Sequence, residues 1–143
     1  MAEGVFRHLL IKEGVQDQFV VDSAGTGAWH VGEPPDGRST QAAARHGVSL
    51  SGSARQVQPA DLDRFDYVIA MDRENLGELE RIQRRSGGRA SLHLLREFDP
   101  DGGGLDVPDP YYDGARGFET VYRMVRRSCE ALLEHLHPAS RDP

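Results

Sequence analysis

The stretch Tyr67-Val68-Ile69-Ala70-Met71 decides the fold class. A continuous run of apolar residues of this length is typical of a strand that is buried on both faces, as in a parallel sheet. Asp72 follows directly and can cap the amino end of a helix. Apolar side chains then recur at helical spacing among charged ones, at Leu76, Leu79 and Ile82. We therefore predict a buried strand that leads straight into an amphipathic helix.

Helices and strands alternate on both sides of this stretch. Toward the carboxyl end, the sequence predicts a strand near Leu92-His93-Leu94 and a long helix from Phe118 to Leu136, where apolar residues recur every three or four positions. Toward the amino end it predicts helices over 2–13, 38–46 and 61–65, and a strand over 19–21. This order predicts an α/β domain with a parallel sheet, helices on both of its faces, right-handed crossovers and a ligand site at the carboxyl ends of the strands.

Composition narrows the class of protein further. The 143 residues, 38% apolar and 28% charged, are the usual size of one domain spanning 1–143. With a net charge of −6, the chain would be repelled by nucleic acid and by an anionic membrane surface, so neither is expected as a partner. No apolar run is long enough for a membrane span, and no signal peptide is evident, so a cytoplasmic location is expected.

Metal ions and disulfides do not enter the predicted chemistry. Cys129 is the single cysteine and cannot form an internal disulfide, and no paired-cysteine spacing predicts a zinc site. His135 and His137 point to different sides of a predicted helix, so they do not form a metal pair. We predict neither a metal nor a cofactor.

Five segments of the chain carry a family resemblance: MAEGVFRHLL at 1–10, VDSAGTGAWHVGEPPD at 21–36, VIAMDREN at 68–75, DVPDPYYDG at 106–114 and RMVRRSCEALLEHL at 123–136. In order and spacing they resemble the low-molecular-weight protein-tyrosine-phosphatase family over essentially the whole chain. The resemblance implies a phosphotyrosine protein phosphatase I-like sheet. In the family, the segment similar to 1–4 follows a first strand and a Cys-x5-Arg loop. The resemblance therefore implies a domain incomplete at its N-terminus, lacking that strand and the catalytic loop.

The family mechanism assigns a role to Asp109. In the family the loop cysteine attacks phosphorus, and the loop arginine holds the phosphoryl oxygens in a bidentate fork. An aspartic acid in an Asp-Pro-Tyr loop protonates the departing tyrosine oxygen and then helps water hydrolyse the cysteinyl phosphate. By motif match that acid is Asp109, between Pro108 and Pro110, whose rings restrict the local backbone. Apart from the resemblance, Asp109 reads as an ordinary loop aspartate.

Three aromatic residues are candidate substrate-binding residues. The resemblance implies that Tyr111 and Tyr112 wall the phosphotyrosine cleft; packing beneath the loop is the other interpretation, and we expect at least one of them in the cleft. Trp29 resembles a variable-loop residue that presents an aromatic wall to the substrate ring. It could equally shield an edge of the core, so both interpretations stay open.

Cys129 is not predicted to be the nucleophile. It shares a helical face with Val125 and Leu132, where a free cysteine behaves as a small buried hydrophobe, and no arginine follows it at Cys-x5-Arg spacing.

The predicted function is phosphotyrosine monoester hydrolysis, with phosphotyrosine proteins or small aryl phosphates as substrates. The chain as given is expected to be inactive, and to be unstable because losing an inner strand leaves backbone groups unpaired. A catalytically dead, phosphatase-like binding module is the alternative. Arsenate reduction is disfavoured because related proteins use additional cysteines for it. The oligomeric state is not predicted.

Overall fold

The computed structural model describes residues 1–27, 31–102, 104–110 and 114–138. The elements, in chain order, are α1 (Ala2–Glu13), the 3-10 helix η1 (Gln16–Gln18), α2 (Gly37–Ala44), α3 (Asp61–Arg64), β1 (Tyr67–Ala70), α4 (Arg73–Ser86), β2 (Ser91–Leu94), the 3-10 helix η2 (Leu95–Phe98) and α5 (Gly114–Leu136). The predicted helices, and the strands predicted at 67–71 and 92–94, are confirmed with small changes at their ends.

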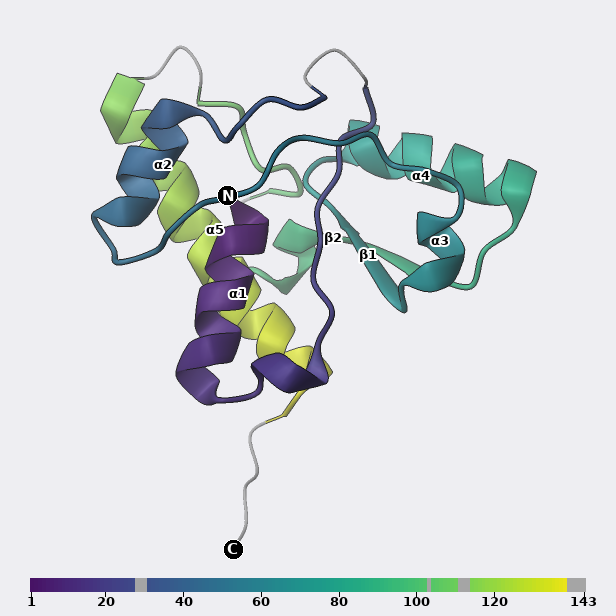
Figure 1. Cartoon of the computed structure of the whole chain (residues 1–143), viewed down its shortest axis with the longest axis horizontal. Helices are drawn as coiled ribbons and strands as arrows, with labels where there is room; N and C mark the ends of the chain where they lie inside the picture. Colours follow the sequence, from purple (N-terminus) through teal and green to yellow (C-terminus); the bar gives the residue numbers. More distant parts are fainter. Residues whose placement is uncertain (28–30, 103, 111–113, 139–143) are drawn as a thin grey trace, which may run out of the picture.

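β1 and β2 form a parallel pair connected through α4. Their register runs from Tyr67 opposite Ser91 to Ala70 opposite Leu94. β1 places apolar side chains on both faces of the sheet, but of its residues only Ala70 is buried and Tyr67 is 44% exposed, so the predicted burial on both faces is met only in part. Val68 and Ala70 join a cluster with residues of α3 and α4, whereas Ile69 lies on the opposite face. Figure 1 shows α3 and α4 on one side of these strands and α1, α2 and α5 on the other.

The larger part of the core lies between α1 and α5, which run side by side (Figure 1). Each helix contributes one apolar face, because its apolar residues recur at helical spacing. The buried members are Val5, Phe6, Leu9 and Leu10 of α1 and Val121, Tyr122, Val125, Cys129, Leu132 and Leu133 of α5. Burying one such aliphatic side chain contributes about 1.5–3 kcal/mol, so this interface is the main source of stability.

The strand predicted over 19–21 is wrong. The backbone at Phe19 is extended, with φ −130° and ψ 143°, but no described strand pairs with this segment, and Val20 is 74% exposed. Its nearest sheet-like contact is an isolated parallel bridge between Gly25 and Gln56. Local β-propensity predicted the extended backbone correctly, but a strand also needs a neighbour to complete its hydrogen bonds. Over the described residues, the edge of β1 that faces away from β2 carries no such neighbour.

Over the same described ranges, no helix combines the length and hydrophobicity needed to cross a bilayer.

Candidate active site

Two loops meet at the carboxyl end of β1. The Val107 N–H donates to the carbonyl of Met71, the residue after the strand, at 2.8 Å. The Asn75 side-chain amide in the first turn of α4 donates to Thr26 Oγ1 at 3.4 Å. The loop that holds Asp109 and the glycine-rich loop that begins at Ser23 therefore both contact the β1–α4 junction. In open α/β folds this end of the strands is where ligands bind, so the ligand site predicted there stays a prediction with these two loops at its edge.

The start of α4 is held in place by its own cap. The Asp72 carboxylate accepts a hydrogen bond from the Asn75 N–H at 2.7 Å, which satisfies one of the free amides of the first turn. The predicted cap is confirmed. Arg73, the first residue of α4, is thereby fixed at the end of β1.

Arg73 binds Asp106 in the loop that holds Asp109. Its backbone N–H and its Nε donate to Asp106 Oδ1 at 2.9 and 3.2 Å, and its Nη2 donates to Oδ2 at 3.2 Å. The guanidinium, and then the backbone N–H, lower the pKa of the Asp106 carboxyl, because both hydrogen bonds favour the charged form. Asp109 follows three residues later and is exposed between Pro108 and Pro110.

A buried charged group supports the same loop. Arg96 is only 8% exposed and donates through Nη1 to the carbonyl of Asp106 at 3.0 Å. Its Nη2 lies 3.5 Å from Asp99, which also accepts hydrogen bonds from Arg127 of α5 at 3.2 and 3.3 Å. Burial by itself would raise the pKa of Asp99. The hydrogen bonds from Arg127 and the Asp101 N–H, with the positive charges of Arg127 and Arg96, outweigh that effect and lower it.

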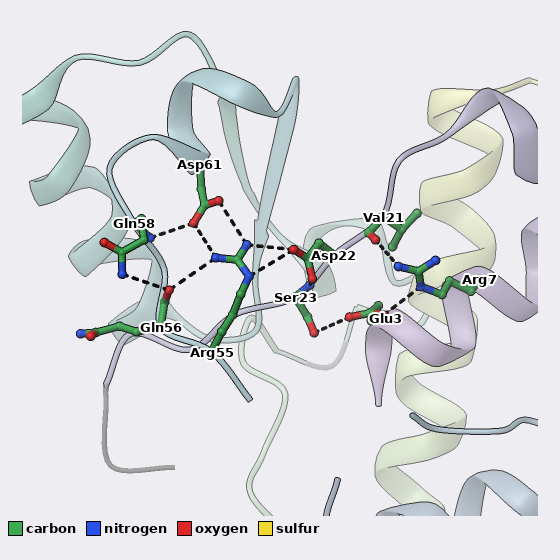
Figure 2. Close-up of polar contacts among 9 residues, drawn as sticks. All are labelled: Glu3, Arg7, Val21, Asp22, Ser23, Arg55, Gln56, Gln58 and Asp61. Atoms are coloured by element: carbon green, nitrogen blue, oxygen red, sulfur yellow. Dashed lines mark hydrogen bonds and ion pairs between the residues drawn. The ribbon is translucent and has the colours of Figure 1, made fainter. Parts of the chain in front are cut away.

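On the other side of the site, polar contacts fix the segment that leads into the glycine-rich loop. Figure 2 shows the Arg55 guanidinium between the carboxylates of Asp22 and Asp61, at 3.1 and 2.9 Å. Glu3, in the first turn of α1, accepts a hydrogen bond from Ser23 Oγ at 2.6 Å. The side-chain hydrogen bond from Arg55 lowers the pKa of Asp61. These contacts tie the first turn of α1 and the start of α3 to the same extended segment.

Arg7 adds a further contact to this group. Its guanidinium donates to the carbonyl of Val21 and also binds Glu3, four residues earlier on α1, at 2.8 Å (Figure 2). Among the described residues, the extended segment is therefore held by side chains of α1 and by Arg55 rather than by a paired strand.

Of the candidate site residues, only Asp109 falls within the described ranges. Trp29, Tyr111 and Tyr112 lie outside the described residues, so their proposed contacts with substrate stay predictions. Sequence reasoning missed Arg73 and Asp106, although both lie within quoted motifs. Their pairing joins positions 33 residues apart, and nothing local in either motif indicates it.

Cys129 is buried in the core, as predicted. It is 1% exposed, and burial raises the pKa of its thiol to about 12. A thiol with this pKa is protonated at neutral pH and is neither a nucleophile nor a metal ligand. Among the residues that the structure describes, no group of three or more histidine, cysteine, aspartate or glutamate side chains is arranged to hold a metal ion.

Comparison with known proteins identifies the family. The family model described as low molecular weight phosphotyrosine protein phosphatase matches residues 1–141. The chain belongs to this family. A low molecular weight protein-tyrosine-phosphatase of Bacillus subtilis, YfkJ, is 44% identical over 93% of this chain and 84% of the relative. The human low molecular weight phosphotyrosine protein phosphatase is 39% identical over 96% of this chain and 87% of the relative.

Solved structures of low-molecular-weight phosphatases and their relatives share the fold. The crystal structure of YfkJ superposes with a TM-score of 0.87 at 40% identity, over 98% of this chain and 87% of YfkJ. A Drosophila protein described as an arginine phosphatase superposes with a TM-score of 0.88 at 34% identity, over 99% of this chain and 90% of that protein. The predicted α/β class and the family are thus confirmed.

Proposed function

We propose that the reaction this phosphatase fold serves is hydrolysis of phosphotyrosine monoesters, on proteins or as small aryl phosphates, with Asp109 as the general acid. The observation that carries the proposal is the family match over residues 1–141, with Asp109 at the acid position of the segment DVPDPYYDG. The named relatives in Bacillus subtilis and human, both tyrosine phosphatases, support the same activity. Tyr111, Tyr112 and Trp29 are the proposed contacts of the substrate ring.

The proposed reaction has two steps. A cysteine thiolate attacks phosphorus and forms an S–P bond, the P–O bond to tyrosine breaks, and the Asp109 carboxyl gives its proton to the departing phenolate oxygen. Asp109, now a carboxylate, takes a proton from water as the water oxygen attacks phosphorus. The S–P bond breaks, which releases inorganic phosphate and restores the thiolate.

The nucleophile of this reaction is a cysteine that residues 1–143 do not supply. Their one thiol, Cys129, is buried in the α1–α5 core and has a pKa of about 12. We therefore propose that the 143 residues alone are inactive, and that a longer form that carries a Cys-x5-Arg loop is active. We also propose a cytoplasmic location, where a reducing environment keeps a free thiol such as Cys129 unoxidised.

The test compares two proteins, the 143-residue chain and the same chain extended upstream in frame. Each is assayed for phosphate release from a phosphotyrosine peptide, with matched phosphoserine and phosphoarginine peptides. We expect hydrolysis of the phosphotyrosine peptide by the extended protein only. A folded extended protein that hydrolyses none of the peptides would support the binding-module alternative. Faster hydrolysis of the phosphoarginine peptide would instead indicate an arginine phosphatase, the activity for which the Drosophila neighbour is named.

A further inference from the structure

We propose that the Arg73–Asp106 pair is a positioning device that fixes Asp109 for proton transfer to the leaving group. The proposal rests on the proposed phosphatase function and adds to it two residues that do not touch substrate themselves. It concerns residues 104–110, which lie between η2 and α5 in the chain.

The pair is held by more contacts than an ordinary surface ion pair. Three Arg73 donors reach the two Asp106 oxygens, at 2.9, 3.2 and 3.2 Å, and one of these donors is the backbone N–H. A bidentate guanidinium–carboxylate contact fixes direction as well as distance. Because the backbone N–H belongs to the capped first turn of α4, Asp106 is fixed relative to the end of β1.

The constraint extends from Asp106 toward Asp109. Only Val107 and Pro108 lie between Asp106 and Asp109 in the chain. The Val107 N–H itself donates a hydrogen bond to the Met71 carbonyl at 2.8 Å. Pro108 and Pro110 fix their own φ angles and restrict the residues before them. Arg96 Nη1 donates a hydrogen bond to the Asp106 carbonyl at 3.0 Å. Little freedom of the backbone is left between the anchored pair and the acid.

The Arg73–Asp106 pair is largely exposed, so a positioning role can be told apart from a role in stability. The Arg73 and Asp106 side chains are 68% and 40% exposed. Exposed ion pairs add little to the free energy of unfolding, so replacing Arg73 leaves the fold intact. A displacement of the acid by even 1 Å reduces proton transfer, so the loss appears in catalysis.

The test uses the chain extended upstream in frame and two substrates that differ in leaving group. Phenolate is a poor leaving group and needs the acid, whereas p-nitrophenolate leaves with little protonation. For Arg73→Ala we expect kcat/KM to fall about tenfold with phenyl phosphate and at most about threefold with p-nitrophenyl phosphate. Arg73→Lys, which keeps the charge and one side-chain donor, recovers part of the loss. The control is Arg81→Ala, which breaks an exposed pair with Glu78 on the same helix and changes neither value.

A second measurement shows whether Arg73 acts through Asp109. In an Asp109→Asn background, Arg73→Ala is expected to cause no further loss with phenyl phosphate, because the group it positions is gone. Three outcomes would each overturn this proposal: equal losses of kcat/KM with both substrates, no loss with either, or full additivity in the double variant. In each of these cases, hydrolysis by the unsubstituted protein still supports the phosphatase activity. An unsubstituted, folded protein that hydrolyses neither substrate overturns the proposed function and this proposal together.

Discussion

At the scale of single residues, Asp99 links pH to stability. Its side chain is fully buried, and its pKa is lowered, so it contributes stability that is present in full above its unfolded pKa of about 4. That contribution is lost as the pH falls through the lowered pKa of the folded state. We expect Asp99→Asn to cost about 3 kcal/mol at pH 7, because it leaves the buried Arg96 charge uncompensated. The cost shrinks progressively below about pH 4.

Urea unfolding of the chain extended upstream in frame and of its Asp99→Asn variant, each at pH 7 and at pH 3, measures this difference. Asp66→Asn is the matched control, since Asp66 forms an exposed pair with Arg89 and its side chain is 77% exposed. We expect this control to change the free energy of unfolding by less than about 0.5 kcal/mol. A cost for Asp99→Asn that is the same at both pH values would contradict the assignment.

Cys129 gives the second prediction at this scale. Because its thiol is buried and protonated, we expect an aromatic disulfide reagent at pH 8 to label it slowly in the native protein and rapidly in urea. Fast labelling of the native protein would show that α1 and α5 separate readily. Cys129→Ala in the extended protein should leave phosphatase activity unchanged. A variant that folds but loses activity would show that Cys129 takes part in catalysis.

Sequence reasoning predicted Asp109 as the acid, a prediction that stays open, but it could not find the side chains that hold the Asp109 loop. Asp109 is readable because the residues that mark it, from Asp106 to Gly114, are contiguous. Arg73 and Arg96 are arginines in segments rich in charge, and what distinguishes them is a partner in another loop. Such pairings depend on how strands and helices are packed, which no local pattern encodes.

At the scale of elements, the cap of α4 makes the next prediction. Asp72→Ala removes the acceptor of the Asn75 N–H and should destabilise the protein by about 1 kcal/mol. Asp72→Asn keeps an acceptor and should cost less. Glu80→Ala, at an exposed position within the same helix, serves as the control. Thermal or urea unfolding measures all three; equal costs for Asp72→Ala and Glu80→Ala would contradict the role of the cap.

The elements also show why some predictions succeeded. α1, α4 and α5 each have an apolar face at helical spacing, so their own sequences predict them. β1 was predicted because it is apolar throughout and flanked by a helix signal. The segment 19–21 has the same local signal as a strand, but pairing is a property of two segments. No described strand pairs with 19–21, so the local pattern predicted more than the described structure contains.

At the scale of the whole molecule, the open edge of β1 should govern solution behaviour. Over the described residues one edge of β1 has no neighbouring strand, and unpaired strand edges favour association. Val20 and Tyr67, 74% and 44% exposed, add exposed apolar surface to the molecule. We expect the 143-residue chain to melt with low cooperativity and to associate as concentration rises, and Val20→Lys to reduce association. Calorimetry and sedimentation test this; a monomer that melts cooperatively would contradict it.

The most direct test of the account is the effect of Asp109→Asn on kcat/KM for phenyl phosphate, measured with the chain extended upstream in frame. If Asp109 protonates the leaving group, the value falls by about 10²- to 10⁴-fold, with a smaller fall for p-nitrophenyl phosphate. A folded Asp109→Asn protein that stays within about threefold of the unsubstituted protein on phenyl phosphate would show that another group supplies the proton.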